Sequence, residues 1–261
     1  MPKMTYSEIV NRLHGEIEKK HALLVTATGI GITAKCQEFA GSDLLVVDCA
    51  ARIRMAGFGS LGGNFAFKKA NEQLLIQAEE ILPIIKKVPV IAGVAAAEPF
   101  SDIITFVDKL SEMGFSGIAN SPSVGWNDEF NQKNLSKLGI GYDSEVALIK
   151  AAHERGLFTV AHCFDASQAA AMASCGADIV IANIGLTSGG LIGAKTVFSM
   201  DEAVNAIQKI CDAAKEANNS VIVLCHGGPL STPCNVACAL SQLSGVAGFL
   251  GESATDRIPM E

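Results

Sequence analysis

Eight short apolar runs recur along this chain, each followed by a glycine-rich or polar cluster, with helical patterns between them. Most runs are rich in Val, Ile and Leu and lack the alternation of a half-buried strand. Such runs are typical of parallel strands that are buried on both faces. They are Leu23–Val25, Leu44–Val47, Val90–Val94, Gly117–Ala119, Phe158–Ala161, Ile179–Ala182, Val221–Leu224 and Val246–Leu250. Eight such units predict an α/β fold, the (β/α)8 TIM barrel, with its active site on the loops that follow the strands.

The domain organisation follows from the length and from the helical patterns. A chain of 261 residues suits one barrel, so we expect a single TIM-barrel domain over residues 1–261. Residues 1–21 predict an N-terminal helix that closes the barrel bottom, because Thr5 and Glu8 have capping-box spacing before an apolar stripe. Few residues follow the last run, so we expect the eighth helix to be truncated. The other helices are expected at Thr33–Phe39, Ala70–Ile85, Ser101–Met113, Ser144–Arg155, Ala166–Cys175, Asp201–Ala217 and Asn235–Leu243.

The composition limits the partners and the location. Hydrophobic residues make up 49% and charged residues 18%, so we expect some apolar surface to be covered in a homo-oligomer. A net charge of −7 argues against a nucleic-acid-binding surface. No stretch approaches the roughly 18–20 apolar residues of a membrane-spanning helix, so no membrane contact is expected. The eight unclustered cysteines and the absence of a signal-peptide pattern indicate reduced thiols in a cytoplasmic protein.

Two connections are longer than the others and follow strands. One runs from Cys49 to Lys69 and contains Arg52 and Arg54, and the other runs from Asn120 to Asp143 and contains the single tryptophan, Trp126. Long loops inside a compact domain are usually lids or binding loops. We therefore expect both at the catalytic face, with the first folded over the mouth of the barrel or reaching a neighbouring subunit.

Residues suited to acid–base chemistry end several of the expected strands. His162 and His226 end the fifth and seventh strands, where an imidazole can exchange protons near neutral pH. Asp48 and Glu98 end the second and third strands, where they could hold Mg²⁺ or act as a general base. Each carboxylate could equally be a loop cap. We take these four as the candidate catalytic residues, with Asp48 and Glu98 as the possible Mg²⁺ ligands.

A second group of residues is suited to anion binding. Arg52 or Arg54 could clamp a carboxylate or a phosphate, although an ion pair with Asp48 or Glu98 would also explain them. Glycines and a serine in the loops after the seventh and eighth strands could present bare amides to a phosphate, although such glycines also make tight turns. The candidate substrate-binding residues are Arg52, Arg54, Asn120, Gly185, Thr187, Gly227, Gly228, Gly251 and Ser253. Cys234 and Cys238 are one helical turn apart, but small buried thiols explain them better than zinc does.

Several motifs, in order along nearly the whole chain, resemble the phosphoenolpyruvate hydrolase-like family. They include Thr28–Lys35, Arg52–Gly57, Pro89–Val94, Asn120–Gly125, Gly185–Gly190, Leu224–Pro229 and Asp256–Pro259. The resemblance implies a TIM barrel of the phosphoenolpyruvate/pyruvate superfamily, and the domain is also similar to the C-terminal half of a plant viral-resistance protein. The chain departs from the family pattern at the mouth, at Cys49-Ala50-Ala51, Asn183, Cys234 and Glu252.

Three functions are compatible with these residues. The resemblance implies an enzyme that hydrolyses or lyses a small phosphorylated or carboxylated acid, with Mg²⁺ as a possible electrophile and a small anionic metabolite as its partner. Because the mouth departs from the family pattern, the second alternative is a non-catalytic barrel that binds a small anion or a protein partner. An isomerase or aldolase-type lyase is the third alternative, weakened because Lys195 is the one lysine expected near the mouth.

Overall fold

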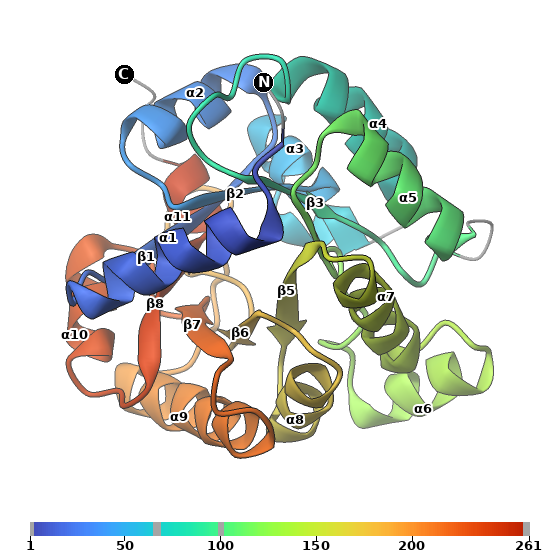
Figure 1. The fold of residues 1–261 in the computed structure, drawn as a ribbon. Coiled ribbons are helices and arrows are strands. Elements are labelled where there is room, and N and C mark those ends of the chain that lie inside the picture. The colour runs from blue at the N-terminus through green and yellow to red at the C-terminus, as the bar shows by residue number, and fades with distance from the viewer. Residues whose placement is uncertain (1–2, 65–68, 99–101, 258–261) are drawn as a thin grey trace.

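The computed structural model describes residues 3–64, 69–98 and 102–257 and contains a closed barrel of eight parallel strands (Figure 1). Each strand pairs with its neighbours in chain order, and β8 pairs with β1 to close the ring. The TIM-barrel prediction is therefore confirmed. The strands are β1 (Leu23–Thr28), β2 (Leu44–Val47), β3 (Val90–Gly93), β4 (Gly117–Ala119), β5 (Phe158–Cys163), β6 (Ile179–Asn183), β7 (Ile222–His226) and β8 (Val246–Gly251).

Helices surround the barrel and connect its strands. They are α1 (Tyr6–Glu18), α2 (Gly31–Phe39), α3 (Cys49–Met55), the 3₁₀ helix η1 (Ser60–Asn64), α4 (Ala70–Ile81), α5 (Ile103–Met113), α6 (Glu129–Lys137), α7 (Tyr142–Glu154), α8 (Ala166–Ser174), α9 (Met200–Ala217), α10 (Pro233–Leu240) and α11 (Ser253–Asp256). In the described part of the chain, α11 is a single turn after β8.

The helix α1 covers the end of the barrel opposite the carboxyl ends of the strands (Figure 1). Ile9 and Leu13 are fully buried there and belong to the same apolar cluster as the barrel-lining Leu23, Phe158 and Ile179. The expected capping box is present, since Thr5 and Glu8 bond to each other's backbone amides. The predicted helix at the barrel bottom is thus confirmed, and the open end of the barrel is the opposite one.

The sequence pattern missed the helices within the long connections, which are α3, the short 3₁₀ helix η1 and α6. In α3, Asp48 caps the first turn by accepting a hydrogen bond from the Ala51 amide at 2.7 Å, so the helix begins directly at the end of β2. In α6 no residue is buried, so there is no apolar stripe to reveal it. The expectation that Cys234 and Cys238 are buried is wrong, because both are exposed on α10.

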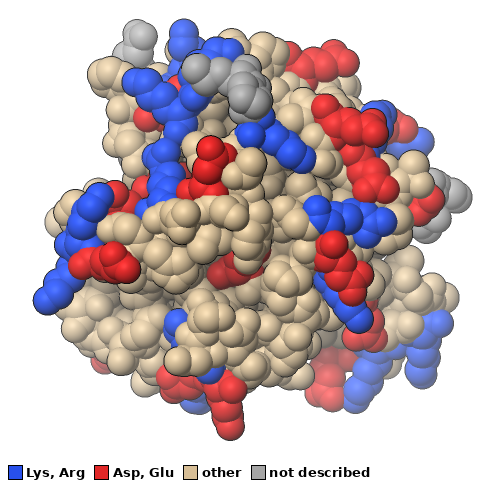
Figure 2. All heavy atoms as spheres, in the orientation of Figure 1, with Lys and Arg blue, Asp and Glu red and all other residues tan. Residues whose placement is uncertain are grey.

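The surface carries charges of both signs. On the face shown in Figure 2, Lys and Arg are interspersed with Asp and Glu, and neither sign forms a continuous patch. Among the described residues, no helix has the length and apolar character needed to cross a membrane.

Candidate functional site

A pocket opens at the carboxyl ends of the strands, where the barrel rule places an active site. Seven of the residues expected from the sequence line it: Asp48, Asn120, His162, Gly185, Thr187, His226 and Ser253. Further residues complete the lining: Ala50, Ser60, Ser121, Pro122, Ser123, Trp126, Phe164, Asn183, Leu186 and Glu252. Ala50 and Ser60 belong to the first long connection and Trp126 to the second, so both connections reach the mouth.

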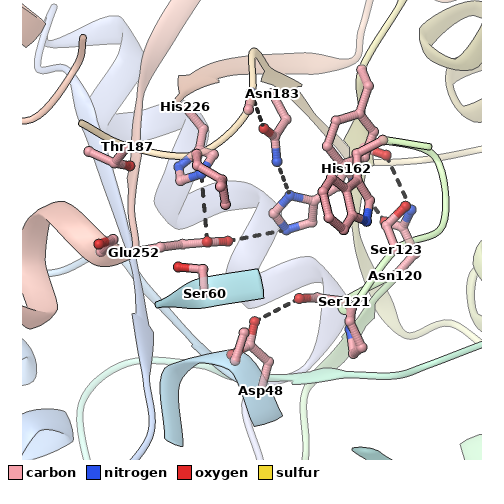
Figure 3. A pocket seen from close by; sticks show the side chains of 17 residues that line it. Asp48, Ser60, Asn120, Ser121, Ser123, His162, Asn183, Thr187, His226 and Glu252 are labelled. Carbon is pink, nitrogen blue, oxygen red and sulfur yellow. Dashed lines mark hydrogen bonds and ion pairs between the residues drawn. The ribbon is translucent and has the colours of Figure 1, made fainter. Parts of the chain in front are cut away.

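Glu252 lies between the two histidines of the pocket, as Figure 3 shows. Its carboxylate is 3.6 Å from Nε2 of His226 and 3.9 Å from Nε2 of His162. The side chain follows β8 directly, so the end of that strand directs it into the pocket. One carboxylate can therefore act electrostatically on both imidazoles.

The hydrogen bonds assign opposite tautomers to the two histidines. Nδ1 of His226 lies 2.9 Å from the Leu250 carbonyl oxygen, which can only accept, so Nδ1 carries the proton and Nε2 has a free lone pair. Asn183 uses its side-chain oxygen to accept from the Gly185 amide, so its amide group faces Nδ1 of His162 at 3.3 Å. Nδ1 of His162 is then an acceptor, and the neutral ring carries its proton on Nε2. The site thus presents a proton acceptor on His226 and a proton donor on His162.

Burial and charge shift the titration of these groups. Burial lowers the pKa of His162, although the Glu252 carboxylate opposes this effect. Burial alone would raise the pKa of Glu252, but the charges of His226, Arg54 and His162 together bring it below its ordinary value. Near neutral pH, an ionised Glu252 therefore faces a neutral His162. Such a carboxylate stabilises positive charge that forms on either ring during a proton transfer.

Asp48 follows β2 and lines the pocket two strands away from Glu252 in the ring. It accepts a hydrogen bond from the Ser121 hydroxyl at 2.6 Å, and its other oxygen caps α3. The residue is fully buried. Asp48 is therefore a fixed wall of the pocket, oriented by two donors.

The two expected anion-binding arginines have different environments. Arg52 is exposed on α3 and does not line the pocket. Arg54 is buried behind Glu252, with Nε 2.5 Å from Asp256 and Nη1 3.6 Å from Glu252. Burial raises the pKa of Asp256 to about 6, although Arg54 opposes the rise. The sequence left open that Arg54 forms an ion pair instead of binding a ligand. It does form ion pairs, but its partners are Asp256 and Glu252 and not Asp48 or Glu98.

A buried carboxylate supports the wall formed by the second long connection. Glu145 on α7 accepts hydrogen bonds from Asn120 at 2.5 Å, from the Ser123 hydroxyl at 2.7 Å and from the Val124 amide at 2.6 Å. Burial raises the pKa of Glu145 to about 7, and these three donors oppose the rise. Asn120 in turn bonds to the backbone of His162. The side chain of Asn120 therefore links β5 to Glu145, although the residue also lines the pocket.

Four other expected site residues do not line the pocket. Glu98 accepts a hydrogen bond from the Asn71 amide at the start of α4. A side chain at Gly227 would overlap the Gly185 carbonyl, and one at Gly228 would come within 2.9 Å of Ile184. A side chain at Gly251 would meet Thr255. These glycines allow close packing of loops, and none of the three lines the pocket.

The sequence interpretation did not assign roles to Glu252, Asn183 and Ser121. All three were within reach of the barrel rule, because Glu252 and Ser121 directly follow strand-end residues and Asn183 ends β6. Glu252 and Asn183 were noted only as departures from the family pattern. Asp256 became relevant through its contact with Arg54, 202 positions away in the sequence.

The carboxylates of the pocket do not fit the expected Mg²⁺ site. Glu98 lies outside the pocket, and both oxygens of Asp48 already accept hydrogen bonds. The remaining pocket carboxylate, Glu252, faces the guanidinium of Arg54 at 3.6 Å, and this positive charge repels a divalent cation. Among the described residues, no group of three His, Cys, Asp or Glu side chains is arranged to hold a metal ion. Mg²⁺ needs several oxygen ligands in near-octahedral geometry, so this donor set is a poor match.

Comparison with known proteins identifies related sequences. The model of the phosphoenolpyruvate hydrolase-like family matches residues 8–261. The ToMV susceptible protein tm-1(GCR26) and the ToMV resistance protein Tm-1(GCR237) of Solanum lycopersicum are each 44% identical to the chain over 253 residues. Each alignment covers 97% of this chain but 34% of the tomato protein, so the chain spans about a third of the length of these relatives.

Solved structures share the fold at low sequence identity. A phosphonopyruvate hydrolase in complex with oxalate and Mg²⁺ is 15% identical with a TM-score of 0.59, covering 97% of this chain and 82% of that one. A 2,3-dimethylmalate lyase of the PEP mutase/isocitrate lyase superfamily is 16% identical with a TM-score of 0.58, covering 93% of this chain and 80% of that one. At these identities the likeness establishes the fold alone.

Proposed function

The chain belongs to the phosphoenolpyruvate hydrolase-like family, and from the geometry of its pocket we propose that it is a lyase or hydrolase for a small carboxylic acid. The observation that carries the proposal is the pair of histidines in opposite tautomers, which meet at Glu252. Acid–base cleavage requires one group that accepts a proton and another that donates one, and here the two groups lie beside the same carboxylate.

The proposed cleavage begins at a hydroxyl of the substrate or at an attacking water. Nε2 of His226 takes the proton, and Glu252 stabilises the imidazolium that forms. The freed oxygen forms a carbonyl or attacks one, and the bond beside the carbonyl breaks with its electrons on the departing carbon. Nε2–H of His162 hydrogen-bonds to the negative charge that develops. The departing carbon then takes up the proton held by Nε2 of His226, which returns that ring to its neutral form.

The pocket favours a carboxylated over a phosphorylated substrate. Among its described lining residues there is no Lys or Arg, and Asp48 and Glu252 both contribute negative charge. A phosphate dianion would meet these two carboxylates with twice the charge of a monocarboxylate, and so with about twice the repulsion. The hydroxyls of Ser60, Thr187 and Ser253 offer hydrogen bonds that suit a monocarboxylate or a carbonyl group.

The chemistry assigned to the chain's own residues does not pass through Mg²⁺. The solved phosphonopyruvate hydrolase contains Mg²⁺, but here Asp48 and Glu98 do not come together. A Schiff-base aldolase is not supported either, because Lys195 is exposed and does not line the pocket.

A panel of acids tests the proposal. Phosphonopyruvate, oxaloacetate, 2,3-dimethylmalate and phosphoenolpyruvate are incubated with the protein, with and without EDTA, and products are followed by ¹H and ³¹P NMR. We expect turnover of at least one carboxylate and a loss of about 100-fold or more in His226→Asn, the scale of general acid–base catalysis. His153→Asn, at an exposed position, is the matched control. Equal turnover in His226→Asn would refute the role of His226.

A second candidate function is non-catalytic binding of a small polar ligand, as the sequence left open. The observation that favours it is that the charges around the pocket are already paired, Arg54 with Asp256 and Glu252, and Asp48 with Ser121. Binding of an acid without turnover in the same panel would support this alternative.

A further inference from the structure

A second compartment lies beside the pocket, between the loops that follow β4, β5 and β6. We call this compartment the outer groove; its apolar part is formed by Trp126, Phe164, Ile184 and Phe198. Trp126, Phe164, Asn183 and Gly185 line both the outer groove and the inner pocket. The two spaces are therefore neighbours that share these four residues.

Resting on the proposed function, we infer that the substrate has two parts: a carboxylate head in the inner pocket and an uncharged, apolar or aromatic tail in the outer groove. The inner pocket holds about 610 Å³ and the outer groove about 1140 Å³, solvent at their open sides included.

The outer groove exposes aromatic side chains that a ligand could contact. Phe198 is 47% exposed, and Trp126 and Phe164 are half-buried. The side-chain amide of Gln132 is committed to the carbonyls of Gly125 and Asn127, so it holds the loop. Exposed aromatic faces beside a polar pocket are typical of sites that bind a ring or an alkyl group.

The charges of the outer groove exclude an anionic tail. Glu129 and Asp165 line it, and its described lining residues include no Lys or Arg. Glu129 is paired with Lys133 at 2.7 Å, but Asp165 forms no ion pair among the described residues, so a phosphate, a second carboxylate or a nucleotide in the groove would meet its negative charge. An uncharged tail avoids this repulsion and gains from leaving water.

The protein carries its own reporter for this inference, because Trp126 is the single tryptophan and lines both compartments. Three probes divide the ligand into parts: lactate as head, benzyl alcohol as tail, and phenyllactate as both. Each is titrated against Trp126 fluorescence in the full chain. We expect phenyllactate to bind at least tenfold more tightly than lactate, and benzyl alcohol to give a saturable change.

Phe198→Ala tests the groove without touching the inner pocket. This variant should lose at least threefold of the phenyllactate affinity and the benzyl alcohol response, while lactate binding stays unchanged. Leu191→Ala is the matched control, since Leu191 lies in the same loop, is 99% exposed and lines neither compartment. It should behave like the wild type with all three probes.

The outcomes separate the inference from the proposed function. If lactate and phenyllactate do not bind but benzyl alcohol binds in a Phe198-dependent way, the carboxylate head is wrong and the tail site stands. If no Phe198-dependent binding is seen with benzyl alcohol or phenyllactate, the inference on the tail is overturned, whatever lactate does. Equal affinity for lactate and phenyllactate would overturn it as well.

Discussion

Arg54→Met removes the positive charge that is paired with two buried carboxylates behind the pocket. Arg54 is buried, with Nε 2.5 Å from Asp256 and Nη1 3.6 Å from Glu252. At an effective dielectric constant of about 20, two unit charges 3.6 Å apart attract by about 5 kcal/mol, from which the cost of burying both must be subtracted. Removal of one partner from a buried ion pair costs about 3–5 kcal/mol, because the other charge stays buried.

We therefore expect Arg54→Met to lower the free energy of unfolding by about 3–5 kcal/mol at pH 7.5. Arg52→Met is the matched control on the same helix; Arg52 is exposed, so its loss should stay within about 0.5 kcal/mol. Urea unfolding followed by Trp126 fluorescence measures both variants.

The loss in Arg54→Met should depend on pH. Burial raises the pKa of Asp256 to about 6 while Arg54 lowers it, so the variant's Asp256 should titrate above the wild-type value. A carboxyl whose folded-state pKa is raised contributes stability that is fully present below its unfolded value and is lost as pH rises through the folded value. The destabilisation should consequently be smaller at pH 5 than at pH 7.5. A loss below about 1 kcal/mol, or the same loss at both pH values, would refute the reasoning.

Three further predictions concern the supporting structure. Glu145→Gln should destabilise the protein by about 1–3 kcal/mol in urea unfolding, because the single side-chain oxygen of Gln cannot accept from all three donors that Glu145 serves. Glu154→Gln, at an exposed position, is the control and should have little effect; equal stabilities of the two variants would contradict the prediction. Gly227→Ala should lower the free energy of unfolding by at least about 2 kcal/mol more than Gly114→Ala does. Both glycines have positive φ, but only a side chain at position 227 would overlap the Gly185 carbonyl, so equal melting temperatures of the two variants would count against the prediction. Light scattering at micromolar concentration should give a mass above the 27.2 kDa of one chain, because Phe39 and Leu191 are 92% and 99% exposed, and a monomer mass would reject the oligomer.

The barrel was predictable from sequence because buried parallel strands have a local signature. The runs at Leu44–Val47 and Gly117–Ala119 match β2 and β4, and the other runs lie at or near the observed strands. The ends of several strands were missed because polar residues such as Thr28, Asn183 and His226 continue the ladder to the mouth. Of these, Asn183 and His226 line the pocket.

The site was harder to predict because its decisive contacts join distant parts of the chain. His162 and His226 were found from their positions at strand ends, but their tautomers depend on Asn183 and on the Leu250 carbonyl. Arg54 was expected to meet a ligand, whereas it pairs with Asp256, which only the closed barrel brings near. Spacing in the sequence carries no information on such contacts.

The central claim is that His226 and His162 both turn Nε2 toward Glu252, with a free lone pair on Nε2 of His226 and a proton on Nε2 of His162. ¹⁵N NMR of protein labelled at histidine measures this directly at pH 8, where burial has lowered the pKa of His162 and its ring is neutral. Assignment uses His226→Asn and His162→Asn. We expect His226 to carry its proton on Nδ1 and His162 on Nε2. The same tautomer on both rings would contradict the proposed acid–base pair.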